Sequence, residues 1–411
     1  MEKKAPVFNF NIFFIAIISL FVVVMAFVAC QRGGRDLKVG LFGAIQTLEK
    51  KSPYDNPTDP DRPLFRYAPG FAILQYPFLL KAKMTSPFEF ENITLSVLLW
   101  YLIKIVLLFI TGFMLFRLIP CVSKEMSLRN LKISFLLALP LIGYELSNSQ
   151  NKLPALFFII ASIYFFERDR RFIAAIFFSI ALTIYIPLVF FILYFILKDK
   201  KFIFSFITAV FIVFIVLPSL VFGFNFNIYL LKEWFDRAIK PFMLTNSYSS
   251  YIDLRASSQS LSSAVGRMFV SGSTGNFKYL ISPNAIHIII KALSAIIVLF
   301  SGFAIWKQSK DVSKGLGYSI FLILALILPQ YCIYYTWGWV FVLYFSVFNY
   351  ISYPGVASGK KKILLSSVCI SFLSICLIGF SSLKHLFLIF WATVIMWLGM
   401  AIVSMDKSDL T

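Results

Sequence analysis

The sequence predicts an all-α membrane protein whose chain crosses the bilayer many times. Apolar residues make up 59% of the 411 residues and charged residues only 14%, which leaves too few polar side chains to cover a water-soluble surface. Several apolar runs, beginning with residues 6–29, reach the length of roughly 20 residues that spans a bilayer core. Basic residues gather in short clusters between these runs, as in cytoplasmic loops.

The basic clusters predict the number and direction of the crossings. If all of them face the cytoplasm, each segment between two clusters makes an even number of crossings, and both termini are cytoplasmic. The long segments between the clusters can lie outside, because long loops are translocated largely regardless of their charge. About twelve helices result: 7–29, 93–119, 131–146, 152–166, 172–186, 187–197, 202–222, 284–306, 316–335, 337–353, 363–380 and 386–405.

Two stretches have basic flanks but are too short for two full crossings. They are residues 132–168 and 171–198, and each is interrupted near its middle, by SNSQNKLP at 147–154 and by Tyr185-Ile186-Pro187. We expect each to form a hairpin of half-length helices whose tip lies below the outer membrane surface. A single proline-kinked span in each stretch is the alternative.

The whole chain is expected to form one continuous membrane domain. Both of its outer loops carry a predicted amphipathic helix that lies in the membrane interface. The predicted apolar face comprises Leu37, Leu41, Ala44/Ile45 and Leu48 in the first loop, where Gly40 and Gly43 weaken the helix, and Ile228, Leu231, Phe235, Ala238/Ile239 and Phe242 in the second. The predicted layout is a first transmembrane helix (1–30), a first outer loop (31–92), transmembrane helices with the two hairpins (93–222), a second outer loop (223–283) and C-terminal transmembrane helices (284–411).

Composition and motifs exclude several classes of function. The net charge of +19 lies mostly between membrane runs, so its expected partner is anionic lipid and no nucleic-acid role is predicted. Walker, dinucleotide-binding and zinc-protease motifs are missing from the sequence. Asp59-Pro60-Asp61 has the Asp-x-Asp pattern of some metal sites, but its prolines favour an exposed turn. We therefore expect no cofactor and no metal.

Two charged residues stand out by their position. Asp36 lies at the start of the first interfacial helix, where it is either a helix N-cap or a catalytic base. Lys104 lies inside an apolar span. It is either paired, with Glu145 as the possible partner, or it extends along the helix to the membrane surface.

Three blocks of sequence, in this order, resemble a known family. The first is Asp36 followed by a helix, Ser52-Pro53-Tyr54-Asp55, Phe65-Arg66-Tyr67-Ala68-Pro69 and Tyr76-Pro77-Phe78. The second is Asn148-Ser149-Gln150-Asn151, and the third is Ser258-Gln259-Ser260-Leu261 with Arg267. Together they resemble the GT-C glycosyltransferases of family 87, the polyprenyl-phosphate-mannose-dependent mannosyltransferases and their bacterial relatives. The chain departs from that pattern at Tyr185, where relatives often have Lys, and after Pro329, where they often have His.

The resemblance implies a GT-C bundle of transmembrane helices and a defined reaction. A sugar, most often mannose in relatives, is transferred with inversion from a polyprenyl-phosphate donor to a glycolipid or polysaccharide acceptor, without a metal. The reaction takes place on the outer face of the cytoplasmic membrane, and Asp36 is the implied base. Two other classes remain as alternatives: a transporter or lipid-linked sugar flippase, and an oligosaccharide polymerase or ligase.

The remaining site residues are assigned by their chemistry. For the donor phosphate we favour Arg66 and Arg267, because a guanidinium group binds phosphate oxygens in bidentate fashion. Arg255, Lys152 and Tyr185 are further candidates, and a solvated surface charge is the alternative for each basic residue. The residues expected to bind the sugar or the acceptor are Tyr54, Tyr67, Asn148, Gln150, Asn151 and Gln259. An interfacial aromatic belt is the alternative for the two tyrosines.

Overall fold

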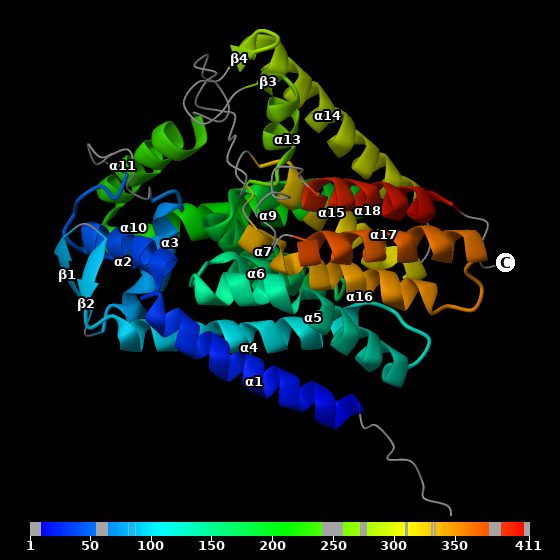
Figure 1. Cartoon of the computed structure of the whole chain (residues 1–411). Coiled ribbons are helices and arrows are strands. Elements are labelled where there is room, and N and C mark those ends of the chain that lie inside the picture. The colour runs from blue at the N-terminus through cyan, green and yellow to red at the C-terminus, as the bar shows by residue number, and fades with distance from the viewer. Residues whose placement is uncertain are drawn as a thin grey trace, which may run out of the picture.

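The protein is a bundle of helices, as the sequence predicts (Figure 1). The computed structural model describes residues 10–54, 65–80, 82–86, 88–240, 258–271, 278–308, 311–329, 332, 334–377 and 388–406. Six helical segments in this part of the chain are long and apolar enough to cross a membrane. They are α1 (Phe10–Gln31), α4 (Thr94–Leu118), α5 (Lys124–Ser147), the continuous segment α9-η3-α10 (Phe202–Val210, Phe211–Val216 and Leu217–Phe222), α14 (Pro283–Lys307) and α18 (Leu388–Met405). The prediction of an all-α polytopic membrane protein is confirmed.

Other helices complete the bundle, and several are shorter than a membrane span. They are α6 (Lys152–Phe166), α7 (Arg171–Ile184), η2 and α8 (Ile186–Phe190 and Phe191–Lys198), η6 (Asp311–Ser313), α15 (Lys314–Ile327), η7 (Tyr334–Trp339), α16 (Val340–Ile351) and α17 (Ser358–Leu377). Between α7 and η2 the chain reverses at Tyr185. This reversal brings Arg171 back to Asp199, and their side chains form an ion pair. This stretch is therefore a hairpin and not a single kinked span.

The other short stretch differs from the prediction. Helix α5 is 24 residues long because it begins at Lys124, where Ser123 caps it by accepting a hydrogen bond from the Met126 amide at 3.2 Å. The predicted half-length helix 131–146 is therefore wrong, since the basic cluster before it is also helical. A turn at residues 148–151 separates α5 from α6, which has 15 residues, so two helices form here as well. Segment η7 packs against both of them.

The predicted basic loops gather at one end of the bundle. Ion pairs and hydrogen bonds join these loops to one another, and one further contact brings the start of α1 to the same end. This arrangement is visible on the right of Figure 1. The contacts are Arg171–Asp199, Lys314–Glu167 at 3.0 Å, Lys198–Gln308 at 3.3 Å, Asn130–Asn349 at 2.9 Å and Lys132–Asn11 at 2.5 Å.

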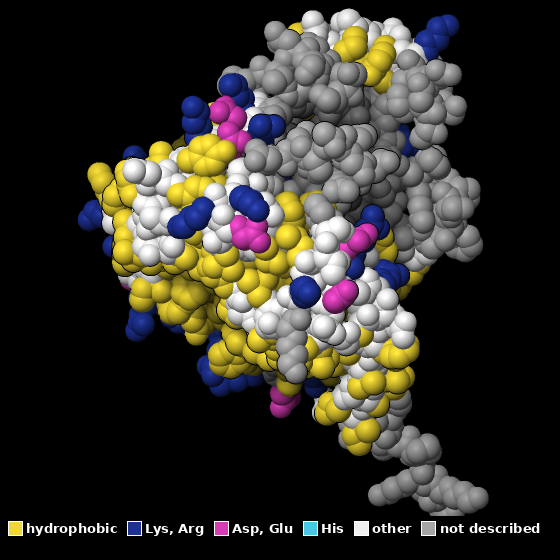
Figure 2. Space-filling model, turned by 90° about the vertical axis from the view of Figure 1, so that its left-hand side faces the viewer, with side chains coloured by type: hydrophobic (Ala, Val, Ile, Leu, Met, Phe, Trp, Pro, Cys, Tyr) yellow, Lys and Arg dark blue, Asp and Glu magenta, His cyan; other side chains and the backbone are white. Residues whose placement is uncertain are grey.

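The elements of the two predicted outer loops lie away from this end. Trp234 of α11 donates a hydrogen bond from Nε1 to the carbonyl of Arg66, at 3.2 Å, and so joins the two loops. Figure 2 views the left-hand side of Figure 1, where basic and acidic side chains lie scattered among hydrophobic ones. The elements are α2 (Arg35–Leu48), α3 (Pro69–Gln75), η1 (Tyr76–Phe78), the antiparallel pair β1 and β2 (Lys83–Ser86 and Glu89–Glu91), α11 (Phe224–Trp234), η4 (Phe235–Ile239), α13 (Leu261–Met268) and the pair β3 and β4 (Val270–Ser271 and Lys278–Tyr279).

Helix α2 is continuous through the two glycines that were expected to weaken it. A Cβ atom on Gly43 would lie 2.2 Å from the Phe65 ring, and one on Gly40 would lie 2.9 Å from Oε1 of Gln75. The glycines therefore allow α3 and the segment before it to pack directly on the α2 backbone. Leu37, Leu41 and Ala44 are buried as predicted, whereas Leu48 is 54% exposed.

The predicted apolar face of the second amphipathic helix is buried against the protein only in part, at Ala238. Ile228 and Phe235 are 40% and 45% exposed, whereas Asn227, Leu230 and Trp234 are buried. The asparagine accounts for the difference, because its Nδ2 donates to the carbonyls of Phe214 and Ile215, at 3.0 and 3.2 Å. Phe242, the last residue of the predicted face, lies outside the described residues.

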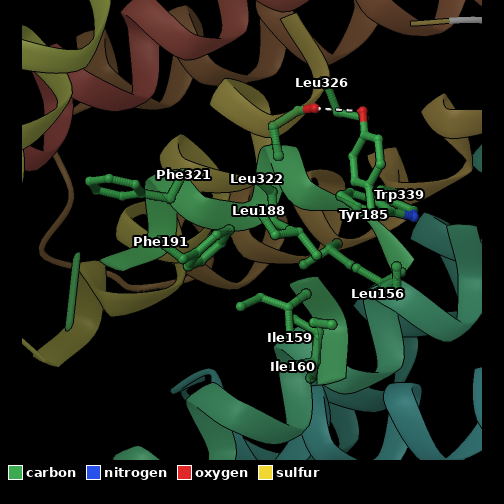
Figure 3. Close-up of a cluster of buried hydrophobic side chains, with 14 of the residues drawn as sticks. Leu156, Ile159, Ile160, Tyr185, Leu188, Phe191, Phe321, Leu322, Leu326 and Trp339 are labelled. Atoms are coloured by element: carbon green, nitrogen blue, oxygen red, sulfur yellow. Dashed lines mark hydrogen bonds between the residues drawn. The ribbon is translucent and has the colours of Figure 1, made fainter. Parts of the chain in front are cut away.

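The core beside the hairpin tips is apolar and aromatic. Figure 3 shows side chains from α6, η2, α8, α15 and η7 meeting in one cluster. Tyr185 is the polar member, and its hydroxyl group donates a hydrogen bond to the carbonyl of Ala325 at 2.9 Å. The labelled members are Leu156, Ile159, Ile160, Tyr185, Leu188, Phe191, Phe321, Leu322, Leu326 and Trp339.

Candidate active site

Asp36 lies at the junction between the first transmembrane helix and the first interfacial helix. Gly33 and Gly34 have φ angles of 60° and 63°, a left-handed conformation that turns the chain from α1 into α2. The N-cap of α2 is Gly34, and Asp36 is the second helical residue. The N-cap interpretation of Asp36 is therefore wrong. Its amide group donates a hydrogen bond to the carbonyl of Asn148 at 3.3 Å, which fixes the start of α2 to the turn between α5 and α6.

The carboxylate of Asp36 is available for chemistry. In the described part of the chain it forms no hydrogen bond and no ion pair. Burial raises the pKa of Asp36 to about 6, while the charges of Arg35, Lys104 and Lys152 act in the opposite direction. A carboxyl group with this pKa is ionised at neutral pH and is a stronger base than an ordinary aspartate.

The turn between α5 and α6 lies directly beside Asp36. Arg32, just after α1, donates hydrogen bonds to Oγ of Ser147 at 3.0 Å and to Oδ1 of Asn148 at 3.2 Å. Ser149 has a positive φ of 55°, a strained conformation for a residue with a side chain. The end of α1 therefore holds this turn, which we call the 148–151 turn.

Tyr67 joins the 148–151 turn to the first outer loop. Its hydroxyl group accepts a hydrogen bond from Nδ2 of Asn151 at 2.7 Å. Burial, together with the nearby charge of Asp36, raises the pKa of Tyr67. Tyr54 is buried and donates from its hydroxyl group to the carbonyl of Tyr67 at 2.7 Å. Tyr67 therefore faces the Asp36 charge, whereas Tyr54 holds the backbone behind it.

A buried ion pair lies below the turn. Nζ of Lys104 is 3.7 Å from Oε2 of Glu145, and both side chains are buried. Oε1 of Glu145 accepts a hydrogen bond from the amide of Leu153 at 3.1 Å, and the backbone of Gln150 donates to the carbonyl of Glu145 at 3.2 Å. The predicted Lys104–Glu145 partnership is confirmed, and the alternative that Lys104 reaches the surface is wrong. Neither residue was among the predicted site residues, although an acid and a base within apolar helices are themselves a signal of function.

Lys152 and Tyr185 lie against each other. The ammonium group of Lys152 is 3.5 Å from the centroid of the Tyr185 ring. The Lys152 carbonyl accepts a hydrogen bond from Nε1 of Trp339 at 3.0 Å, and the Trp339 ring meets the Tyr185 ring edge-on (Figure 3). Because the Tyr185 hydroxyl group is committed to Ala325, the ring is the part of this side chain that faces the site.

Of the remaining predicted residues, Gln259 lies at this site and Arg66 lies beside Trp234. Gln259 is buried. Its backbone amide donates a hydrogen bond to the carbonyl of Cys332 at 2.7 Å. The thiol of Cys332 lies within electrostatic reach of Lys152. Gln259 therefore borders the Lys152 side of the site. Arg66 is exposed near Trp234.

Arg267 is the basic residue in the last turn of α13, a helix that packs against α14. The cations that act on the Asp36 carboxyl group in the described part of the chain are Arg35, Lys104 and Lys152, and not Arg66 or Arg267. Arg255, Asp59 and Asp61 lie outside the residues that the structure describes.

The site thus combines an acid at a helix start, amide and tyrosine side chains around a turn, and a cation on an aromatic ring. A comparison with protein families matches residues 65–329 to glycosyltransferase family 87. The chain belongs to this family. Its membership makes the protein a membrane glycosyltransferase, and the matched range holds the 148–151 turn, Lys152 and Gln259, whereas Asp36 precedes it. No curated protein and no solved structure matches the chain.

Proposed function

We propose that this family 87 glycosyltransferase transfers a hexose such as mannose from a polyprenyl-phosphate donor to a glycolipid or polysaccharide acceptor. The proposed place is the outer face of the cytoplasmic membrane. The position of the basic loops supports this orientation, because such loops face the cytoplasm, and Asp36 follows the end of α1 farthest from them. The proposed site therefore faces outward, and both termini face inward.

The observation that carries the proposal is that the Asp36 carboxylate, beside the 148–151 turn, has no hydrogen-bond or ion-pair partner among the described residues. A base must be free to accept the acceptor's proton, and its pKa of about 6 leaves it ionised at neutral pH. A structural carboxylate would instead be paired or hydrogen-bonded in the folded state, as Glu145 is. The two acids therefore have different roles, with Asp36 available to the substrate and Glu145 committed to the fold.

The reaction follows from these groups. As the acceptor hydroxyl oxygen attacks the anomeric carbon, Asp36 takes up its proton and the bond from that carbon to the phosphate oxygen breaks. One glycosidic bond forms, and polyprenyl phosphate leaves with the bonding electrons. Attack on the face opposite the phosphate inverts the anomeric carbon. The transition state carries positive charge on the sugar and negative charge on the departing phosphate.

The polar residues around Asp36 suit the binding of sugar hydroxyl groups. Oδ1 of Asn151 and Oγ of Ser149 are buried and have no hydrogen-bond partner within the described ranges, so a ligand would satisfy both. Gln150 belongs to the same turn, and Tyr67 lies beside it. We assign the sugar to these groups, and assign Tyr54 and Asn148 to holding the site together because their side chains are bonded to the protein.

The test is sugar transfer by the purified protein from labelled polyprenyl-phosphate hexoses. Asp36→Asn is expected to lower kcat by at least about a hundredfold. Glu49→Gln, at the exposed C-terminal end of the same helix, is the matched control and is expected to retain wild-type activity. Equal rates for wild type and Asp36→Asn would refute the base assignment. A wild-type protein that accepts sugar nucleotides and rejects lipid phosphates would refute the donor class.

A further inference from the structure

The ammonium group of Lys152 is held by an aromatic face and not by a carboxylate. It lies 3.5 Å from the centroid of the Tyr185 ring, and within the described ranges it forms no ion pair and donates no hydrogen bond. A partly buried ammonium group in an apolar helix bundle usually has an acidic partner. Among the described residues, the N–H donors of Lys152 are therefore left for a ligand.

The two acids close to Lys152 do not occupy these donors. Glu145 pairs with Lys104 and accepts the Leu153 amide. Asp36 acts on Lys152 through its charge, but no ion pair joins them. An aromatic ring stabilises a cation without neutralising it, so the Tyr185 ring offsets part of the cost of burying the Lys152 charge, and an incoming anion would stabilise that charge further.

Two elements, α15 and η7, fix Lys152 and the Tyr185 ring in place. The Tyr185 hydroxyl group is bonded to Ala325 of α15, which fixes the plane of the ring. Trp339 of η7 bonds the Lys152 carbonyl, and its ring packs edge-on against Tyr185, with ring centroids 5.6 Å apart. Figure 3 shows Tyr185 and Trp339 side by side above the apolar cluster. The Lys152 ammonium group is therefore held in position before any ligand binds, which lowers the entropy lost on binding.

We propose that Lys152, seated on the ring of Tyr185, binds the phosphate group of the lipid-linked donor. Tyr185 is then a positioning residue that acts through its ring and not through its hydroxyl group. This inference rests on the proposed function. It makes Lys152, which lies within electrostatic reach of Asp36, the first phosphate contact in place of Arg66 and Arg267. A cation there stabilises the charge that develops on the departing phosphate.

The test separates binding of the phosphate from transfer of the sugar. Binding of farnesyl phosphate and of farnesol to the purified full-length protein is measured in parallel. Lys152→Met is expected to weaken farnesyl phosphate binding by about tenfold and to leave farnesol binding unchanged. Tyr185→Phe, which keeps the ring, is expected to bind like wild type, whereas Tyr185→Leu is expected to bind about fivefold more weakly.

Lys314→Met is the matched control, because Lys314 pairs with Glu167 among the basic loops, and it is expected to bind like wild type. Farnesyl phosphate binding that survives Lys152→Met would overturn the inference, and so would a Tyr185→Phe variant as weak as Tyr185→Leu. Should Tyr185→Leu not fold, the Lys152→Met and Tyr185→Phe variants decide the outcome.

The Asp36→Asn variant separates this inference from the proposed function. It is expected to bind farnesyl phosphate like wild type and to transfer no sugar. If it transfers sugar normally, the base assignment fails and the phosphate site stands. If wild type binds farnesol as tightly as farnesyl phosphate, the phosphate site and the lipid-phosphate donor class both fail.

Discussion

The ammonium group of Lys104 and the carboxylate of Glu145 lie 3.7 Å apart, with both side chains buried between α4 and α5. The same carboxylate bonds the Leu153 amide at the start of α6. One acid therefore connects three helices just below the 148–151 turn. Its position explains how the turn is held next to Asp36.

Breaking this pair is expected to destabilise the protein. Lys104→Met leaves a buried carboxylate without its cation and is expected to cost about 3–5 kcal/mol, measured as a fall in thermal unfolding temperature in detergent. The double variant Lys104→Met/Glu145→Gln removes both charges and keeps an acceptor for Leu153. It is expected to be more stable than Lys104→Met alone. A single variant as stable as wild type would contradict a structural role for the pair.

The activity is expected to fall on the acid side of pH 6. Burial raises the pKa of Asp36 to about 6, and a base must be unprotonated, so kcat/KM is expected to reach half of its plateau near that pH and to decline below it. Arg35→Gln removes the charge that lowers this pKa most. The half-point is then expected to rise by up to about half a pH unit. A half-point near pH 4, unchanged by Arg35→Gln, would show that Asp36 is not the titrating group.

The close packing on α2 predicts a strong effect of a single methyl group. Gly43→Ala places a Cβ where the Phe65 ring lies, which pushes away the segment that carries Tyr67. The expected cost is about 1–3 kcal/mol, together with a loss of transfer activity. Gly359→Ala is the control, because nothing lies within 4 Å of its Cβ position. It is expected to be neutral or slightly stabilising in helix α17. Equal stability of the two variants would refute the close packing of the Phe65 ring on Gly43.

The hydrogen bond between Asn151 and Tyr67 provides a further test of the site. Tyr67→Phe leaves the Asn151 side chain without its partner at Nδ2, while Oδ1 already has none among the described residues. We expect an increase in KM for the sugar donor of about fivefold to tenfold with a smaller change in kcat, since the tyrosine positions a binding group. Tyr54→Phe, which removes the bond to the Tyr67 carbonyl, is expected to lower stability by about 1 kcal/mol. A Tyr67→Phe variant with wild-type KM would remove Asn151 from the sugar site.

Much of the fold was predictable because apolar length and basic flanks are local properties of the sequence. The chain reversal at Tyr185 was predicted from Pro187. The Lys104–Glu145 pair was predicted from the rarity of charged residues in apolar transmembrane helices. The start of α5 was missed because a basic, capped segment can be the first turns of a membrane helix. Leu48, Ile228 and Phe235 of the predicted apolar faces are exposed and do not pack into the bundle, because an amphipathic pattern does not distinguish a surface facing lipid from one facing protein.

The site was harder to predict than the fold. Asp36, Asn151 and Tyr67 were chosen from motifs and Lys152 from its chemistry, and the structure brings them together. Arg66 and Arg267 lie in those motifs and were favoured for the chemistry of their guanidinium groups, but the cations that act on Asp36 in the described part of the chain are Arg35, Lys104 and Lys152. Which loops meet depends on long-range packing, such as the close approach of Phe65 to Gly43, and no local pattern in the sequence encodes that approach.

The left-handed Gly33–Gly34 turn lets the first transmembrane helix and the helix that carries Asp36 run in different directions. A Cβ at Gly34 would lie 2.5 Å from Val97, so α2 is pressed against α4 and the bundle, while most of α1 faces outward. Membranes of different thickness change the tilt of a transmembrane helix. We expect the Gly33–Gly34 turn to absorb such a change in α1, so that turnover by the enzyme depends little on the acyl-chain length of the surrounding lipids. Reconstitution in bilayers of graded thickness measures this directly.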